Sequence, residues 1–227
     1  MRIVFLALSA AALALGAQAA GADVIYTTLP AALTTAPNPG GGCCDGTGVW
    51  FNPLTGYAES RGYYFPDALN VDGEFFLLSD TSFGSAEAEI YTQGLFSRGN
   101  GVIYASSSNL NPARFDVGQS IGAGTGYQNP GAGYPDLGPS FGNWSPGRGF
   151  LGLTLRDPNS SNIYYGFADI TVNADYSITL NAFAFENDPG TAITTSYKAP
   201  AAVPEPASWL LFGAGLAGLA ARRRRRT

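Results

Sequence analysis

Between residues 150 and 197 hydrophobic and polar residues alternate along the chain, as they do in half-buried β-strands. The alternation predicts strands at Phe150–Arg156 and Ile163–Val172, and a third strand that begins at Ile178. In the first strand one face carries Leu151, Leu153 and Leu155. In the second strand one face carries Tyr165, Phe167, Asp169 and Thr171, and the other carries Tyr164, Ala168, Ile170 and Val172. In the third we expect Ile178, Leu180, Ala182 and Ala184 on one face, opposite Thr179, Asn181, Phe183 and Phe185.

Turn signals separate these strands. Asn173-Ala174-Asp175 has the length of a hairpin turn, and Asn187-Asp188-Pro189-Gly190 precedes a further run at Thr191–Tyr197. Additional strands are predicted at Asp23–Thr28, Glu74–Leu78, Ala86–Ser97, Val102–Ala105 and Arg114–Ile121. Two Gly- and Pro-rich stretches, Thr34–Gly48 and Gly118–Gly149, are expected to be long loops.

Residues 23–198 contain no stretch of twelve or more residues with helical periodicity. We therefore expect an all-β domain, an antiparallel β-sandwich of the jelly-roll or lectin-like kind, with a closed barrel as the alternative. Its length allows roughly ten to thirteen strands.

Composition and charge exclude several functions. The chain contains no His, which excludes every His-dependent triad, general base and metal site. The net charge is −5, but six of the 12 basic residues lie at the two ends. Residues 21–205 hold six basic and 17 acidic residues, a net charge of −11. An acidic body repels phosphate backbones, so we expect no nucleic-acid partner.

The first 22 residues are predicted to be a signal peptide. Arg2 is followed by an apolar run from Ile3 to Ala17, and small residues at Ala17-Gln18-Ala19 or Ala20-Gly21-Ala22 offer cleavage sites for a signal peptidase. An uncleaved membrane anchor or a buried helix is the alternative.

The last 29 residues have three parts: a linker at 199–206, an apolar segment at 207–221 and a basic tail at 222–227. A 15-residue helix spans about 22 Å, less than the roughly 30 Å hydrocarbon core, but snorkelling arginines and local thinning offset the difference. We predict a single transmembrane helix. The membrane stop signal consists of Arg222, Arg223, Arg224, Arg225 and Arg226, which stay in the cytoplasm.

Pro204, Glu205 and Pro206, followed by an apolar segment and an arginine cluster, resemble the PEP-CTERM sorting signal of Gram-negative bacteria. The resemblance implies an inner-membrane intermediate, processing by an exosortase at or near the motif, and delivery to the cell surface or the extracellular polysaccharide matrix. A plain tail anchor is the alternative. Phe150–Thr195 also resembles a β-rich module of mature PEP-CTERM proteins, through Gly149-Phe150-Leu151-Gly152, Tyr164-Tyr165-Gly166-Phe167 and Glu186-Asn187-Asp188-Pro189-Gly190. That module implies no activity.

Cys43 and Cys44 are the only cysteines. Their α-carbons lie about 3.8 Å apart across a trans peptide, whereas ordinary disulfides span 4.4 to 6.8 Å. A vicinal disulfide would therefore be strained, and free thiols or bridges to another chain are the alternatives. Two thiolates do not complete a zinc site. We expect no bound metal or cofactor.

The acidic residues provide only weak candidates for catalysis. Glu87 and Glu89 share a strand face, and Asp67 and Asp72 are close in sequence, but nothing marks either pair as a glycosidase pair. A calcium site in an acidic loop is an alternative, although no EF-hand-type string supports it. The sequence therefore predicts an exported, non-enzymatic surface or matrix protein. The alternatives are a carbohydrate-binding module that uses exposed Tyr and Trp, with exopolysaccharide as the partner, and a secreted hydrolase.

Overall fold

The structure is a computed structural model of residues 1–227. It describes residues 23–37, 45–64, 75–80, 87–92, 100–105, 111–128, 137, 144–157 and 159–197. The chain divides into two compact units, Met1–Tyr197 and Lys198–Thr227. All of the described residues belong to the first unit.

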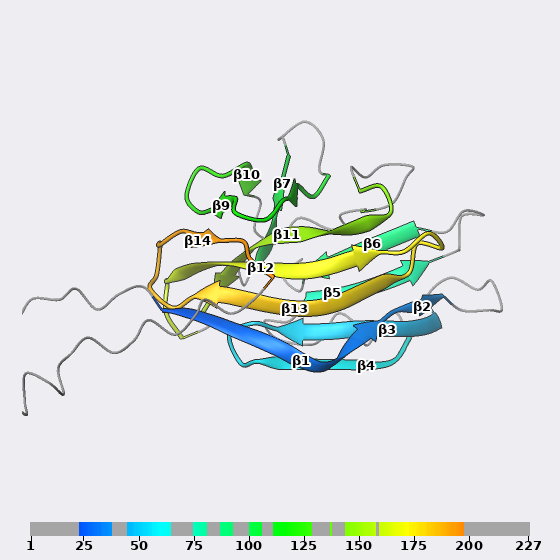
Figure 1. Ribbon diagram of the computed structural model, residues 1–227. Helices are drawn as coiled ribbons and strands as arrows, with labels where there is room; N and C mark the ends of the chain where they lie inside the picture. The colour runs from blue at the N-terminus through cyan, green and yellow to red at the C-terminus, as the bar shows by residue number, and fades with distance from the viewer. Residues whose placement is uncertain are drawn as a thin grey trace, which may run out of the picture. The chain divides into compact units, whose positions relative to one another are not determined.

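The larger sheet has seven strands, all antiparallel to their neighbours. Six of them follow one another across the sheet in the order β1 (Val24–Thr34), β13 (Ile178–Glu186), β12 (Ile163–Val172), β11 (Gly147–Arg156), β7 (Gly101–Tyr104) and β10 (Tyr127–Gln128). The seventh, β8 (Arg114–Phe115), also pairs with β11. Figure 1 shows β1, β13, β12 and β11 side by side, so the N-terminal strand joins the hairpin strands nearest the C-terminus.

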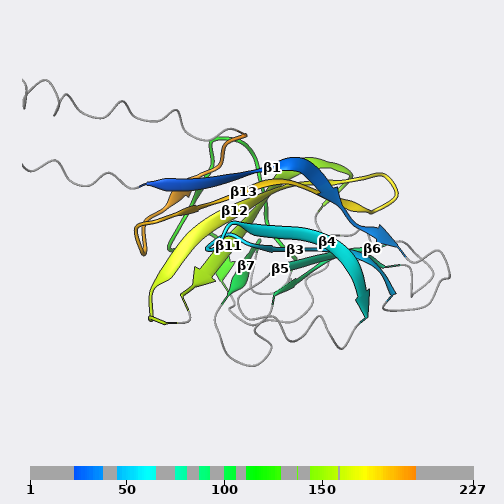
Figure 2. The same ribbon diagram turned by 90° about the horizontal axis from the view of Figure 1, so that it is seen from below.

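The second sheet has five antiparallel strands. They are β2 (Ala36–Pro37), β3 (Asp45–Asn52), β4 (Tyr57–Tyr64), β5 (Phe75–Asp80) and β6 (Glu87–Thr92). A two-stranded sheet joins β9 (Ser120–Ile121) to β14 (Ile193–Thr194). Figure 2, which views the molecule from below, shows the strong bends of β12 and β4. Because Thr35 alone separates β1 from β2, the N-terminal segment passes from the seven-stranded to the five-stranded sheet.

The main hydrophobic core combines side chains from these two sheets. Val49, Phe51, Phe75, Leu77 and Ile90 come from the five-stranded sheet, and the leucines of β11 with Ile170, Leu180 and Phe183 come from the seven-stranded sheet. The rings of Phe51 and Phe183 join the two sheets at a centroid distance of 5.6 Å. A second cluster lies on the opposite face of the seven-stranded sheet and includes Phe150, Phe167, Ile121 and Ile193. The seven-stranded sheet is therefore buried on both faces over part of its surface.

The expected all-β, antiparallel class is confirmed for the described residues, which contain no helix. β12 has the predicted bounds, Ile163–Val172, and β11 extends the predicted strand by three residues toward Gly147. The predicted face assignments in β11 and β12 also hold, because the leucines and Ile170 lie in the main core whereas Tyr165 and Phe167 lie in the second cluster.

The predicted faces of β13 are wrong beyond Asn181. A β-bulge interrupts the pairing with β12, where Asp169 pairs with Ala182 but Ile170 pairs with Leu180. Asn181 is the additional residue, and a bulge places two consecutive side chains on the same side of the sheet. Phe183 and Phe185 therefore join Ile178 and Leu180 in the main core, and Ala184 joins the second cluster.

The two Gly- and Pro-rich stretches contain more regular structure than expected. Residues 34–48 include β2 and the start of β3, and residues 118–149 include β9, β10 and the start of β11. Strands β3 and β4 are missing from the sequence prediction, because Gly and aromatic residues obscure the alternation over 45–64. The run predicted at Arg114–Ile121 forms two short strands, β8 and β9, because Gly118 turns the chain with a φ of 83°. The run at Thr191–Tyr197 forms only β14.

Candidate functional site

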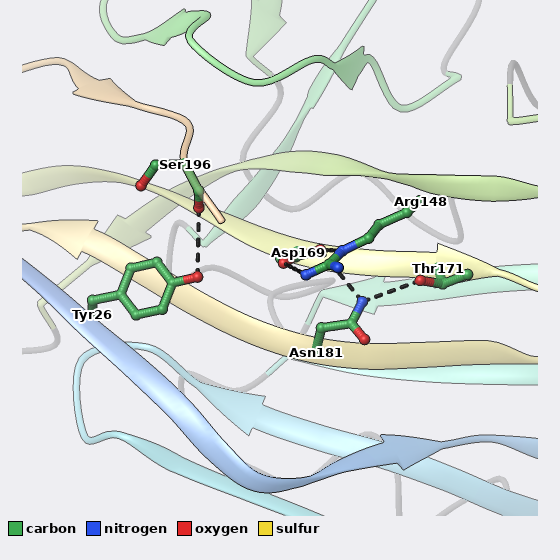
Figure 3. Close-up of polar contacts among 6 residues, drawn as sticks. All are labelled: Tyr26, Arg148, Asp169, Thr171, Asn181 and Ser196. Carbon is green, nitrogen blue, oxygen red and sulfur yellow. Dashed lines mark hydrogen bonds and ion pairs between the residues drawn. The ribbon is translucent and has the colours of Figure 1, made fainter. Parts of the chain in front are cut away.

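An ion pair with one buried partner lies on the face of the seven-stranded sheet that points away from the main core (Figure 3). Arg148 of β11 donates from Nε to Asp169 Oδ1 at 2.8 Å and from Nη2 to Asp169 Oδ2 at 2.6 Å. The Asp169 side chain is fully buried, whereas 46% of the Arg148 side chain is exposed. The hydrogen bond to Asp169 raises the pKa of Arg148 above its ordinary value. This geometry fixes the planar guanidinium at the sheet surface.

The bulge in β13 adds Asn181 to this pair. Asn181 Nδ2 donates to Asp169 Oδ1 at 3.3 Å and to Thr171 Oγ1 at 3.1 Å. Figure 3 shows the amide nitrogen turned toward both partners and the amide oxygen turned away from them. Asp169 thus orients two side chains from two neighbouring strands, and it does so from a position that solvent does not reach.

Strand β14 and the three residues that follow it are held across the same face by hydrogen bonds and ring contacts. We call Ile193–Tyr197 the C-terminal strap. Thr195 makes most of its hydrogen bonds: its carbonyl accepts from Gly118 N at 2.9 Å, its N–H donates to Gln119 O at 2.9 Å, and its hydroxyl accepts from Gln119 N at 3.0 Å. The Tyr197 ring lies 4.8 Å from the Phe150 ring, and the Arg148 guanidinium lies over it at 4.4 Å. The strap therefore covers the second hydrophobic cluster and ends beside the ion pair.

Tyr26 connects β1 to the strap. Its hydroxyl donates to Ser196 O at 3.4 Å, and its ring meets Phe167 edge-on at 6.1 Å. Burial raises the pKa of the Tyr26 phenol, and the nearby Asp169 charge adds to the increase. The raised pKa keeps the Tyr26 phenol neutral, which is the form that can donate the hydrogen bond to Ser196 O.

The residues that the sequence singles out lie mostly elsewhere in the chain. Cys43, Cys44, the Pro204–Pro206 motif and the five arginines of the tail lie outside the described residues, as do the predicted signal peptide and transmembrane segment. In the described part of the chain no helix is long and apolar enough to cross a membrane, and no group of three or more acidic or Cys side chains could hold a metal ion.

Of the carboxylates considered for hydrolysis, Glu89 is the one whose side chain the structure describes, and it does not lie on this face. Glu89 lies on β6 of the other sheet and accepts a hydrogen bond from the Tyr91 hydroxyl at 2.7 Å. The side chain of Glu87, together with Asp67 and Asp72, lies outside the described residues. The sequence patterns did not single out Asp169 or Arg148 as a site. The one sequence feature that could have indicated the site is Asp169, a carboxylate on the same strand face as the aromatic residues Tyr165 and Phe167.

The aromatic residues differ from those expected of a stacking platform. The rings of Trp50 and Phe76 stack on the five-stranded sheet with their centroids 4.1 Å apart, but both side chains are buried. Trp144 is buried as well, so the expectation of exposed Trp is wrong for the described tryptophans. Among the described aromatic residues only Tyr57 and Tyr197 are exposed, and they do not form a row on one sheet.

Comparison with known families identifies the C-terminal segment. Residues 202–226 match the family model described as the PEP-CTERM protein-sorting motif. The chain is therefore a protein that carries a PEP-CTERM sorting signal, as the sequence predicted. The motif supports processing by an exosortase and export toward the cell surface. A search of curated proteins and a search of solved structures found no match. The resemblance of Phe150–Thr195 to other PEP-CTERM proteins stays a prediction.

The hydrogen bonds of Asp175, in the turn between β12 and β13, should make the stability of the protein depend on pH. Asp175 Oδ1 accepts hydrogen bonds from Ser177 Oγ at 2.7 Å and from Ser177 N at 3.1 Å, and these bonds lower the pKa of Asp175. A lowered pKa contributes stability above the unfolded value of about 3.9, and this stability is lost as pH falls through the folded value. We expect the Tm advantage of the wild type over Asp175→Asn to shrink between about pH 5 and pH 2. Calorimetric scans across this range measure it.

Ser177→Ala provides the companion variant, because it removes the hydroxyl that binds the carboxylate. It should show a smaller Tm deficit at low pH than at neutral pH. A deficit of constant size in both variants would contradict the role of this turn.

Proposed function

We propose that the protein is a non-enzymatic component of the cell surface or extracellular matrix, with its β-rich unit in a structural or adhesive role. The observation that carries the proposal is the sorting motif at residues 202–226, which follows in sequence a unit whose described residues form only β-strands and turns. Because the sorting signal directs the domain out of the cell, it supports a function of the domain outside the cell. Secreted hydrolysis is the competing function.

The hydrogen bonds of the buried Asp169 carboxylate support a structural role for the β-rich unit. Both oxygens of this buried carboxylate accept hydrogen bonds from Arg148, and one also accepts from Asn181. A general acid or base has to exchange a proton with a substrate. Asp169 instead holds neighbouring side chains in place.

We infer further that the unit is a β-sandwich of the jelly-roll or lectin-like kind. The shared core and the Phe51–Phe183 contact support face-to-face packing of the two sheets. Passage of the N-terminal segment from one sheet to the other at Thr35 supports the same architecture.

The sorting steps assign roles to residues at the ends of the chain. A signal peptidase would remove residues 1–22, and the arginine cluster 222–226 would halt transfer at the inner membrane. The exosortase would then recognise Pro204, Glu205 and Pro206. The matched range contains this motif and the arginines.

Intact mass spectrometry of protein recovered from the medium and from membranes tests the proposal. We expect the surface or released form to begin after Ala19 or Ala22 and to lack Arg222–Arg226, and we expect Glu205→Ala to accumulate with its tail intact. If all of the wild-type protein kept the arginines, the tail would be a permanent anchor. Release of reducing sugars from exopolysaccharide by the purified protein, with loss of that activity in a carboxylate variant, would establish a hydrolase instead.

A further inference from the structure

The outward face of the seven-stranded sheet has an apolar half and a polar half. The strap and β9 cover the apolar half, where Ile121 and Ile193 pack on Phe150 and Phe167. The polar half begins where the strap ends. We call its partly exposed side chains the polar patch: Arg148, Thr171, Thr179, Asn181 and Tyr197.

The polar patch is held in one arrangement before any ligand arrives. Asp169 fixes Arg148 through two hydrogen bonds and Asn181 through a third. Arg148 in turn lies over the Tyr197 ring, whose exposed fraction is 45%. Side chains locked from beneath by a buried partner lose little conformational entropy on binding. Beta-bulges that re-aim a side chain are common beside functional sites, and here the bulge supplies Asn181.

The chemistry of the polar patch selects a class of ligand. Asn181 turns its amide oxygen away from its two partners (Figure 3), and Thr171 accepts from Asn181, which leaves its hydroxyl proton to donate elsewhere. A planar guanidinium, an amide oxygen and a hydroxyl offer paired donors and acceptors to the vicinal hydroxyls of a sugar. The Tyr197 ring adds an apolar surface with a polar end, which suits the C–H groups of a pyranose.

The charge of this surface further restricts the class of ligand that the polar patch can bind. Arg148 and Asp169 neutralise each other, and residues 21–205 carry a net charge of −11. A polyanionic chain would be repelled at this surface. We propose that Arg148, Asn181 and Tyr197 form a binding site for a neutral, hexose-containing polysaccharide. This inference rests on the proposed function, because an exported protein is the one that meets such a polymer.

Affinity electrophoresis of the full chain in detergent tests the site. The gels contain dextran, a neutral mannan or a neutral galactan, and alginate serves as the polyanion. We expect at least one neutral polysaccharide to retard the wild type. Asn181→Ala and Tyr197→Ala should each weaken that retardation at least about tenfold, the effect of losing one well-placed contact of roughly 1.4 kcal/mol.

Two further variants separate binding from folding. Tyr57→Ala is the matched control, because it removes an exposed tyrosine from the other sheet, and its retardation should equal that of the wild type. Tyr197→Phe keeps the ring and should keep most of the retardation. The inference is overturned if no neutral polysaccharide retards the protein, if alginate retards it more, or if Tyr57→Ala weakens binding as much as Tyr197→Ala. Any of these results leaves the mass measurement of sorting unaffected, so the two proposals fail separately.

Discussion

Replacing Phe183 with alanine is expected to lower the free energy of unfolding by about 3–5 kcal/mol, the usual cost of removing a fully buried phenylalanine. Phe183 is 0% exposed, and its ring contacts Phe51 from the opposite sheet at 5.6 Å. The substitution removes the transfer free energy of the ring and leaves a cavity between the two sheets. Urea unfolding followed by tryptophan fluorescence measures the change.

Tyr57→Ala is again a suitable control, since an exposed residue on β4 should change stability by no more than about 0.5 kcal/mol. The comparison also tests the bulge. Without the bulge, strict alternation would place Phe183 on the outward face. A loss for Phe183→Ala no larger than that for Tyr57→Ala would contradict the observed register.

Periodicity alone predicts the parts of the fold in which it is uninterrupted. β12 and β11 alternate without a break over ten residues each, and their faces follow directly from the sequence. In β13 a single additional residue, Asn181, inverts the faces of everything that follows. No residue type in this segment indicates a bulge, so only the pairing with Asp169 and Ile170 shows where it falls.

The candidate site could not be assembled from sequence because its members come from distant segments. Arg148 and Asp169 meet through the antiparallel register of β11 and β12, in which Arg148 pairs with Thr171. Tyr26 and Tyr197 arrive from opposite ends of the domain. By contrast, the residues of the sorting signal are contiguous, so their order along the chain is sufficient to identify the motif.

Removing Arg148 is expected to be the other strongly destabilising substitution. Arg148→Ala leaves the fully buried Asp169 carboxylate without its charge partner, and breaking a buried pair typically costs about 3–5 kcal/mol. Because nearly half of the Arg148 side chain is exposed, water can reach the vacated position, and we expect a loss of about 2–3 kcal/mol. The same variant also frees the Tyr197 ring, so the strap should lose protection from hydrogen exchange.

A double-mutant cycle isolates the pair from these secondary losses. When Asp169→Ala and Arg148→Ala are combined, no buried charge remains unpaired, so the double variant should be more stable than the sum of the two single losses predicts, by at least about 1 kcal/mol. Urea unfolding of the four proteins gives the coupling free energy. Strict additivity would mean that Asp169 finds other partners when Arg148 is absent, and that the bidentate contact does not hold the outward face together.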